Sequence, residues 1–447
     1  MTATDDPLSL LGDLVAKAKK AGAEAADAVH FSSTGLSHAQ RLGAPERLER
    51  EESHDVGLRV MIGRRQAIVS STDLAADSIN ELVERAVAMA KVVPEDPYCG
   101  LAAPEELATS VPDLDILDSD EPAPELLIER ARACEEAARS VKGVTNSEGA
   151  EASWSRIEIA LVTSNGFARG YGRSGHSVGV SVIAGEGLGM ESDYEFASAV
   201  YGGELEDPAA VGQRAGERAV KRLGAKKPPT KRLPVVYDPR VSNSLLRHLA
   251  GAISGPSIAR GTSFLKDKLN GQVFAEGITI VDDPHRPHGL ASKPFDGEGL
   301  PNRKMNIVEG GRLTTWILDL SSARQLGMHS TGHAARGTSS PPSPSTSNLY
   351  MAPGSVTPEQ LIAEIDEGFY ITGMMGMGIN GVTGDYSRGA SGFRIEKGEL
   401  TYPISEATVA GNLKQMFMNI TPANDLVFKY GANAPTLRID GMTLAGN

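Results

Sequence analysis

The chain has 447 residues, of which 40% are hydrophobic and 23% charged, a composition typical of a globular protein with two or three domains. Its formal net charge of -13 argues against a general nucleic-acid binder, which needs a basic surface to neutralise phosphates. No apolar run approaches the roughly 20 residues of a membrane span, and the start of the chain lacks the pattern of a signal peptide. We therefore expect no nucleic-acid partner, no membrane partner and a cytoplasmic location.

The first half of the chain alternates between helical and strand patterns. Strands are predicted over 25–38, in a hairpin of 56–62 with 67–71, and in an antiparallel meander over 154–182. The Pro- and Asp-rich stretch 93–124 predicts an irregular excursion. Cys134 falls on the apolar face of a helix, which favours a core residue over a nucleophile. Apolar residues at helical spacing predict helices over 8–21, 78–93, 124–142 and 207–223.

A charged, Pro-rich segment at 225–234 predicts a linker between two domains. We expect an α+β protein, with an N-terminal mixed α/β domain over 1–224 and a β-rich C-terminal domain over 235–447. The C-terminal domain is predicted to consist of antiparallel sheets with few helices. Its predicted elements are strands at 233–239, 278–281, 306–308, 313–317, 346–351 and 436–439, and helices at 241–253 and 358–367.

The glycine-rich segment 368–411 interleaves glycine with large apolar residues, which predicts an ordered segment that other strands close over. Its end, 393–404, predicts two strands joined at Lys397-Gly398. A G-x-G-x-x-G motif begins at Gly376, but no helix follows it, so the pattern argues against a dinucleotide site. Asp385 and Arg388 of this segment are candidates for an ion pair.

His329 and His333 have the H-x-x-x-H spacing that suits zinc on a helix. The residues around them are poor helix formers, and no glutamate follows His329, so a loop that lines a cleft is favoured. Asp282 and Asp283 follow a predicted strand and are either ligands or, as we favour, turn residues. An independent metal-dependent peptidase that uses His329 and His333 remains an alternative.

Four long segments then carry a resemblance. The segments RGTSFLKDKLNGQVFAEGITIVDDP (260–284), GLPNRKMNIVEGGRLTTWILD (299–319), TGHAARGTSSPPSPSTSNLYMAPG (331–354) and GMGINGVTGDYSRGASGFRIEKGE (376–399) occur in this order. Together they strongly resemble the TldD/PmbA family, and more closely its PmbA (TldE) branch. The resemblance is specific over 233–447 and looser before it. It implies a cytosolic zinc metallopeptidase complex; the family also bears the label modulator of DNA gyrase, which the net charge does not support.

The resemblance implies that the TldD-type subunit carries an H-E-x-x-x-H helix and a later cysteine, whereas the PmbA-type subunit lacks these ligands. The matching helix lies at 245–254, with Arg247 in place of the first histidine, His248 in place of the glutamate and Ala252 in place of the second histidine. No cysteine occurs in 424–447. We therefore expect no catalytic residue and no metal in this chain, with zinc in the partner subunit. Whether the chain is an enzyme by itself stays open.

The expected function is that of a non-catalytic subunit in a TldD/TldE-type metalloprotease. Its partner is a TldD-type subunit, and the complex acts on unfolded peptides in peptide maturation and antitoxin turnover. An alternative for the whole chain is a homodimeric peptide-binding protein, and a homodimer is also possible when the partner is missing. For the loop 329–344, the alternative to peptide contact is a purely structural role. The loop 329–344 is the candidate for peptide contact, and 346–351 is a candidate edge strand for peptide pairing. The candidate substrate-binding residues are His329, His333, Arg336, Ser339 and Ser340.

Overall fold

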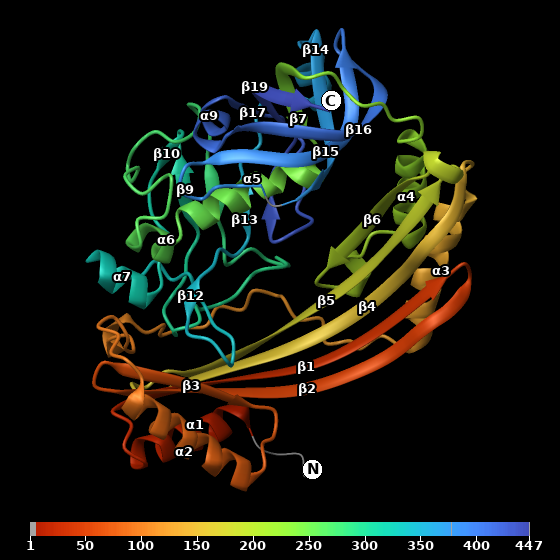
Figure 1. Cartoon of the computed structure of the whole chain (residues 1–447). Coiled ribbons are helices and arrows are strands. Elements are labelled where there is room, and N and C mark those ends of the chain that lie inside the picture. The colour runs from red at the N-terminus through yellow and green to blue at the C-terminus, as the bar shows by residue number, and fades with distance from the viewer. Residues whose placement is uncertain (1–5, 377, 447) are drawn as a thin grey trace.

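The computed structural model describes residues 6–376 and 378–446. It confirms the α+β class, with one long sheet in the N-terminal half and three further sheets in the C-terminal half (Figure 1). The elements of the first half are α1 (Pro7–Lys20), β1 (Ala25–Arg41), β2 (Ala44–Ile62), β3 (Arg65–Ser71), α2 (Ala76–Val92), η1 (Pro104–Glu106), α3 (Pro124–Ser140), β4 (Val144–Thr163), β5 (Ala168–Ala184), η2 (Gly187–Gly189), β6 (Glu191–Ala199), η3 (Gly202–Glu204) and α4 (Pro208–Lys221).

The N-terminal sheet is antiparallel throughout, in the order β3-β2-β1-β4-β5-β6. Its four central strands are 17 to 20 residues long, which corresponds to a length of roughly 60 Å. Register shifts in β1 and β4 accompany a pronounced curvature of the sheet, which Figure 1 shows. The sheet is therefore a long curved blade with a convex and a concave face.

The described helices of the first half, α1 to α4, cover the convex face, at both ends of the blade. Alternate side chains of a strand point to opposite faces. Ala26 and Ala28 of β1 pack with α1 and α2, and Leu36, on the same face of β1, packs with α3 and α4. Val29, on the other face, packs with Phe295 of the C-terminal half. The concave face thus faces the C-terminal domain.

The second half is built around a curled sheet. The elements are β7 (Lys231–Tyr237), α5 (Pro239–Ala252), α6 (Gly255–Ala259), β8 (Ile280–Asp282), β9 (Met305–Glu309), β10 (Arg312–Leu313), α7 (Leu320–Leu326), β11 (Ala334–Ala335), β12 (Ser343–Pro344), β13 (Leu349–Met351), α8 (Pro358–Ala363), β14 (Glu367–Met375), β15 (Asp385–Glu396), β16 (Glu399–Asn412), α9 (Leu413–Met418), β17 (Ile420–Pro422), β18 (Ala432–Asn433) and β19 (Leu437–Ala445).

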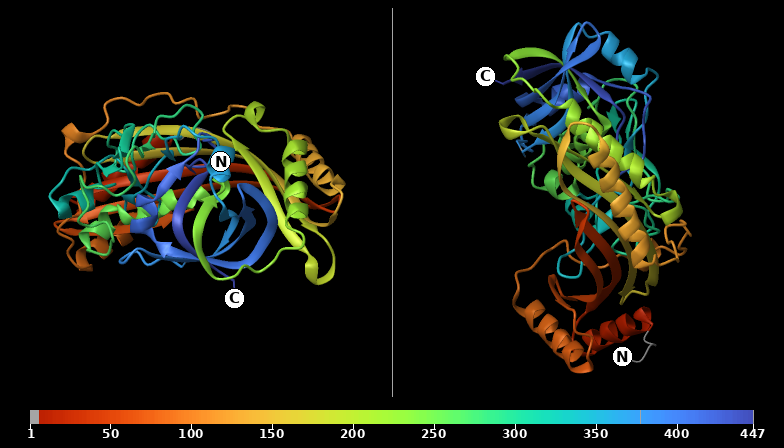
Figure 2. Two further views of the ribbon diagram at one scale, coloured as in Figure 1. Left: turned by 90° about the horizontal axis from the view of Figure 1, so that it is seen from above. Right: turned by 90° about the vertical axis from the view of Figure 1, so that its right-hand side faces the viewer.

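Strands β16-β15-β14-β7-β19 form a ring, because β16 also pairs with β19. Figure 2 shows this ring from above. The glycine-rich segment supplies β14, β15 and β16, so the prediction that other strands close over it is confirmed. Lys397 and Gly398 both have positive φ, at 52° and 80°, as the predicted two-residue turn requires. A second sheet, β10-β9-β8-β13-β18, shares one large core with the ring and α5.

Several predicted elements differ from the structure. The predicted strand 346–351 shortens to β13, and it is not an edge, because it lies between β8 and β18. The expectation of an edge strand there was therefore wrong. The C-terminal sheets are also not purely antiparallel, since β7 pairs in parallel with β14, and β13 with β18. The domain border at 225–234 stays a prediction. In the described part of the chain no helix is long and apolar enough to cross a membrane.

Candidate functional site

Helix α5 carries the positions that the resemblance matched to a zinc motif. Asp238 caps its N-terminus by accepting a hydrogen bond from the backbone N–H of Arg240 at 2.9 Å. One face of the helix is buried in the core of the C-terminal domain (Leu245, Leu246, Leu249 and Ala252). Another face, with Arg240, Ser244 and Arg247, lines a pocket between the two halves of the chain.

The three matched positions do not fit a zinc ion. The Arg247 guanidinium, which donates to Asn243 Oδ1 at 2.8 Å, is a cation with hydrogen-bond donors only. Ala252 is buried and has no ligand atom. His248 alone carries a zinc-type ligand, and a structural or catalytic site needs at least three protein ligands. Across residues 6–376 and 378–446, no group of three or more His, Cys, Asp or Glu is placed to hold a metal ion.

His248 lies beside two positive charges. Its ring meets that of Tyr386 edge-on, with centroids 6.0 Å apart. Burial, then the guanidinium of Arg388, then that of Arg247 lower the pKa of His248 to about 4. Its buried Nε2 has no hydrogen-bond partner in the part of the chain that the structure describes. His248 is therefore neutral at pH 7, with one buried ring nitrogen left without a hydrogen-bond partner among the described residues.

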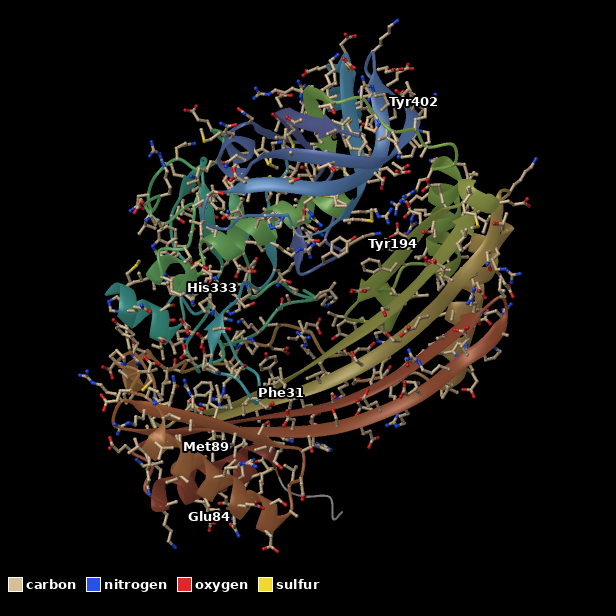
Figure 3. The ribbon with its side chains drawn as sticks, viewed as in Figure 1. Phe31, Glu84, Met89, Tyr194, His333 and Tyr402 are labelled. Carbon is tan, nitrogen blue, oxygen red and sulfur yellow. The ribbon has the colours of Figure 1, made fainter. Side chains whose placement is uncertain are left out.

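The pocket has a volume of about 770 Å³ and is lined by α5, the end of β14, the middle of β15 and β16, and β6. Figure 3 shows Tyr194 of β6 pointing from the blade toward the C-terminal domain at this place. Asp193 forms ion pairs with Arg240 at 2.8 Å and with Arg222 at 3.5 Å, so the pocket wall joins the two domains by charge. The arginines that line the pocket are Arg222, Arg240, Arg247 and Arg388.

The loop 329–344 does not lie in this pocket. It forms a short hairpin of β11 and β12 whose tip reaches the blade (Figure 1). The Arg336 guanidinium is buried in an ion pair with Asp27 of β1, and the Thr338 hydroxyl donates to Asp55 of β2. His333 is buried as well, whereas His329, Ser339 and Ser340 are exposed. The loop thus packs on the other domain, and its contact with peptide stays a prediction.

Asp27 is the centre of a buried charged cluster at this junction. Arg59 of β2 donates to Asp27 Oδ2 through Nε at 2.9 Å, and Arg336 approaches the other carboxylate oxygen. Burial alone would raise the pKa of Asp27, but Arg336 and Arg59 outweigh burial and hold that pKa below its usual value. Residues from both halves of the chain therefore share one buried ion cluster.

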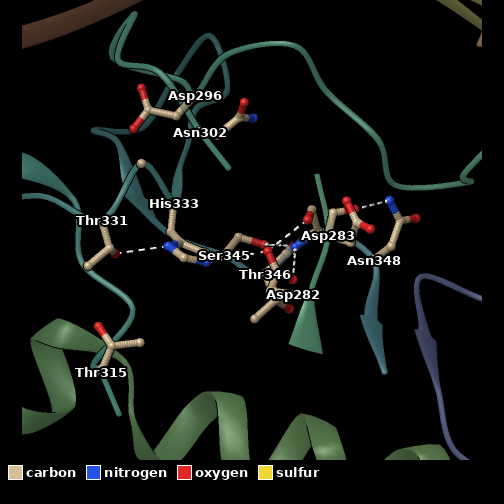
Figure 4. Close-up of polar contacts among 12 residues, drawn as sticks. Asp282, Asp283, Asp296, Asn302, Thr315, Thr331, His333, Ser345, Thr346 and Asn348 are labelled. Carbon is tan, nitrogen blue, oxygen red and sulfur yellow. Dashed lines mark hydrogen bonds and ion pairs between the residues drawn. The ribbon is translucent and has the colours of Figure 1, made fainter. Parts of the chain in front are cut away.

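His333 meets Asp282 rather than His329. Figure 4 shows its ring between Thr331 and Asp282. Nδ1 lies 2.8 Å from the Thr331 hydroxyl, and Nε2 lies 3.3 Å from Asp282 Oδ2. Asp282 also accepts hydrogen bonds from the backbone and hydroxyl of Ser347, at 2.8 and 2.7 Å. Both residues thus hold the loops together, and the described residues supply no third ligand beside them.

Sequence reasoning did not place the arginines of the pocket. It expected Arg388 to pair with Asp385, but residues three apart on a strand point to opposite faces. The Asp385 carboxylate instead accepts from Thr383 and Asn412, and Arg388 Nε donates to the Gly376 carbonyl at 2.9 Å. The alternation of side chains along β15 could have shown from the sequence that Asp385 and Arg388 point to opposite faces.

Comparisons with known proteins agree with this architecture. Residues 26–90 match the PmbA/TldA metallopeptidase domain 1, residues 117–223 its central domain and residues 230–446 its C-terminal domain. The chain is 37% identical to the metalloprotease PmbA of Escherichia coli O157:H7, over 97% of this chain and 94% of that protein. It is 35% identical to a PmbA homologue of Haemophilus influenzae, over 96% and 94% of the two chains.

Solved structures share the whole fold. A protein named as a modulator of DNA gyrase from Bacteroides thetaiotaomicron superposes with a TM-score of 0.91 at 27% identity, covering 100% of both chains. TldE from Thermococcus kodakarensis superposes with a TM-score of 0.86 at 20% identity, covering 98% of this chain and 100% of that one, which is a likeness of fold. With three domains matched in order and relatives aligned over nearly their full length, the chain belongs to the PmbA/TldD metallopeptidase family.

Proposed function

We propose that this chain is the non-catalytic, PmbA/TldE-type subunit of a two-chain metalloprotease. The observation that carries the proposal is helix α5, where a guanidinium, an uncoordinated imidazole and a buried methyl group occupy the positions matched to a zinc motif. In this proposal a TldD-type partner holds the zinc ion, and this chain closes a chamber over it in the cytoplasm. The substrates are unfolded peptides, in peptide maturation and antitoxin turnover.

The shape of the chain supports this role. The concave face of the blade is not covered by helices of its own domain, and near β5 and β6 it carries a groove of about 510 Å³. Small or polar side chains and glutamates line much of this groove (Ser177, Gly179, Ser181, Ser198, Glu46, Glu148, Glu151 and Glu195). Such a surface suits an extended chain without a fixed sequence, because it offers hydrogen bonds and few side-chain pockets.

Co-expression with a TldD-type protein tests the proposal. We expect a stable complex by size-exclusion chromatography with light scattering, and cleavage of an unfolded peptide only when both chains are present. Replacing the histidines of the partner's motif should abolish cleavage, and the isolated chain should contain no stoichiometric zinc by elemental analysis. A zinc-loaded isolated chain that cleaves peptide, and loses the metal on His333→Ala, would instead favour the independent peptidase. A stable homodimer that ignores the partner would favour the peptide-binding protein.

A further inference from the structure

The pocket beside α5 contains two arginines without an acidic partner. Three of the four acidic residues of its wall pair with other cations: Asp193 with Arg240 and Arg222, Glu191 with Arg222 at 3.2 Å, and Glu406 with Lys227 at 2.6 Å. The fourth, Glu148, accepts a hydrogen bond from the Ser181 hydroxyl. Arg247 donates to the Asn243 amide and Arg388 to the Gly376 carbonyl, both neutral acceptors. Within the described residues no carboxylate forms an ion pair with either guanidinium, although the whole chain has a net charge of -13.

These two guanidinium groups come from different elements and line the same pocket. Arg247 lies on α5 and Arg388 on β15, and both line the pocket. Both charges act on His248, whose ring nitrogen Nε2 has no partner among the described residues. Guanidinium groups bind carboxylates through paired, charge-assisted hydrogen bonds. We propose that this pocket binds a carboxylate group of an extended peptide between Arg247 and Arg388.

The neighbouring backbone indicates a peptide rather than a free anion. Gly373–Met375 of β14 pair with β15 on one side, while the described part of β7 pairs only with Phe369–Ile371. The end of β14 therefore presents one strand side to the pocket, where the backbone of a bound peptide can pair. Leu188, Met190 and Met375 line the same pocket with strongly exposed side chains. They supply apolar contacts for the side chains of such a peptide.

This inference rests on the proposed function in that the ligand is a peptide, but its test uses this chain alone. We would titrate the full chain with an N-acetylated hexapeptide of alternating Ala and Ser, ending either in a free carboxylate or in an amide, and follow binding by calorimetry. The free carboxylate form should bind at least tenfold more tightly. Arg247→Gln and Arg388→Gln should each remove about tenfold of that preference, and Arg247→Lys should retain part of it.

Arg312→Gln is the matched control, because Arg312 is exposed, its guanidinium donates to the Asn270 carbonyl at 3.4 Å, and it lies outside the pocket. Equal binding of the two peptides, no binding of either, or an equal effect of Arg312→Gln would overturn the inference. So would tighter binding of inorganic phosphate than of the peptide. Thermal unfolding of each variant checks that the fold is kept. If the carboxylate test fails but the chain still forms the complex with its partner, the proposed function stands. If the chain binds the carboxylate but forms no complex, the proposed function alone is refuted.

Discussion

The carboxylate of Asp27 separates two buried guanidinium groups, Arg59 and Arg336. Asp27→Asn keeps the size of the side chain and removes its charge, which leaves the two buried cations without the carboxylate that they both pair with. We expect a loss of about 3–5 kcal/mol in the free energy of unfolding, measured by urea denaturation at pH 7. Arg50→Gln is the control, because Arg50 pairs with Glu121 at an exposed site, where a loss below about 1 kcal/mol is expected.

The ion pairs of Asp27 with Arg59 and Arg336 also make the free energy of unfolding depend on pH, in a defined direction. The pKa of Asp27 in the folded chain lies below the usual 3.8, so its stabilising effect is complete above that pH and disappears as the pH falls through the folded value. The acid side of the stability curve should therefore flatten in Asp27→Asn. An unchanged acid limb together with unchanged stability at pH 7 would contradict the role given to Asp27.

His248 gives a second prediction at this scale. Its pKa, about 4, is lowered by burial first and then by Arg388 and Arg247. Removing one cation in Arg388→Gln should raise the pKa of His248, as measured by NMR titration of the imidazole, while Arg312→Gln should not change it. Since the folded pKa lies below the usual 6.5, wild-type stability is lost as the pH falls from 6.5 toward 4. An unshifted titration in Arg388→Gln would show that the two groups do not interact.

Helices α3 and α4 pack with almost no space between them. A Cβ added at Gly212 of α4 would lie 1.9 Å from the carbonyl oxygen of Cys134 in α3. Gly212→Ala should therefore push the helices apart and cost about 1–3 kcal/mol in thermal unfolding. Gly12 of α1 has no atom within 4 Å of such a Cβ, so Gly12→Ala should instead stabilise by about 0.5–1 kcal/mol. Equal effects of the two substitutions would refute the close packing.

At the scale of elements, the sequence predicted those helices and strands that are set by residues close together in the chain. The predicted helices over 8–21, 78–93, 124–142 and 207–223 are all present as α1 to α4, because each has one apolar stripe. The first half of β2 was not predicted, since its residues are charged and exposed and owe their strand to pairing with β1. The pairing of β13 with β18 joins positions 349 and 432, which lie 83 residues apart, and a sequence does not show such a contact. β13 was therefore predicted to be an edge strand.

In the candidate site as well, features set by single residues could be predicted from the sequence, and features set by distant contacts could not. The loss of the zinc ligands was readable from Arg247, His248 and Ala252 alone, because side-chain chemistry excludes them. The pocket could not be predicted, because its arginines come from the C-cap of α4, from α5 and from β15, and they come together only when the blade lies against the ring. The burial of Arg336 was equally hidden, since its partner Asp27 is 309 positions away along the chain, from 27 to 336.

The two halves of the molecule are joined at several places, and one of them is where the hairpin tip meets the blade. A Cβ added at Gly57 of β2 would lie 2.3 Å from the Thr338 carbonyl oxygen, so this glycine lets the tip approach the sheet. Thr338 also binds Asp55, and Arg336 enters the Asp27 cluster two residues before it. Charge, hydrogen bonding and close packing therefore all act at this contact between the two halves, and we expect the halves to unfold together.

The chain carries two tryptophans, and they report on the two domains separately. Trp154 is buried in the blade and Trp316 in the C-terminal core. Chains with Trp154→Phe or Trp316→Phe should show the same urea midpoint by fluorescence, because docking couples the domains. Adding Gly57→Ala should separate the midpoints, since the tip can no longer dock, whereas Gly35→Ala, whose nearest neighbour would be 3.8 Å away, should not. Midpoints that stay together in Gly57→Ala would mean that other contacts, such as the ion pairs of Asp193 with Arg240 and Arg222, suffice to couple the domains.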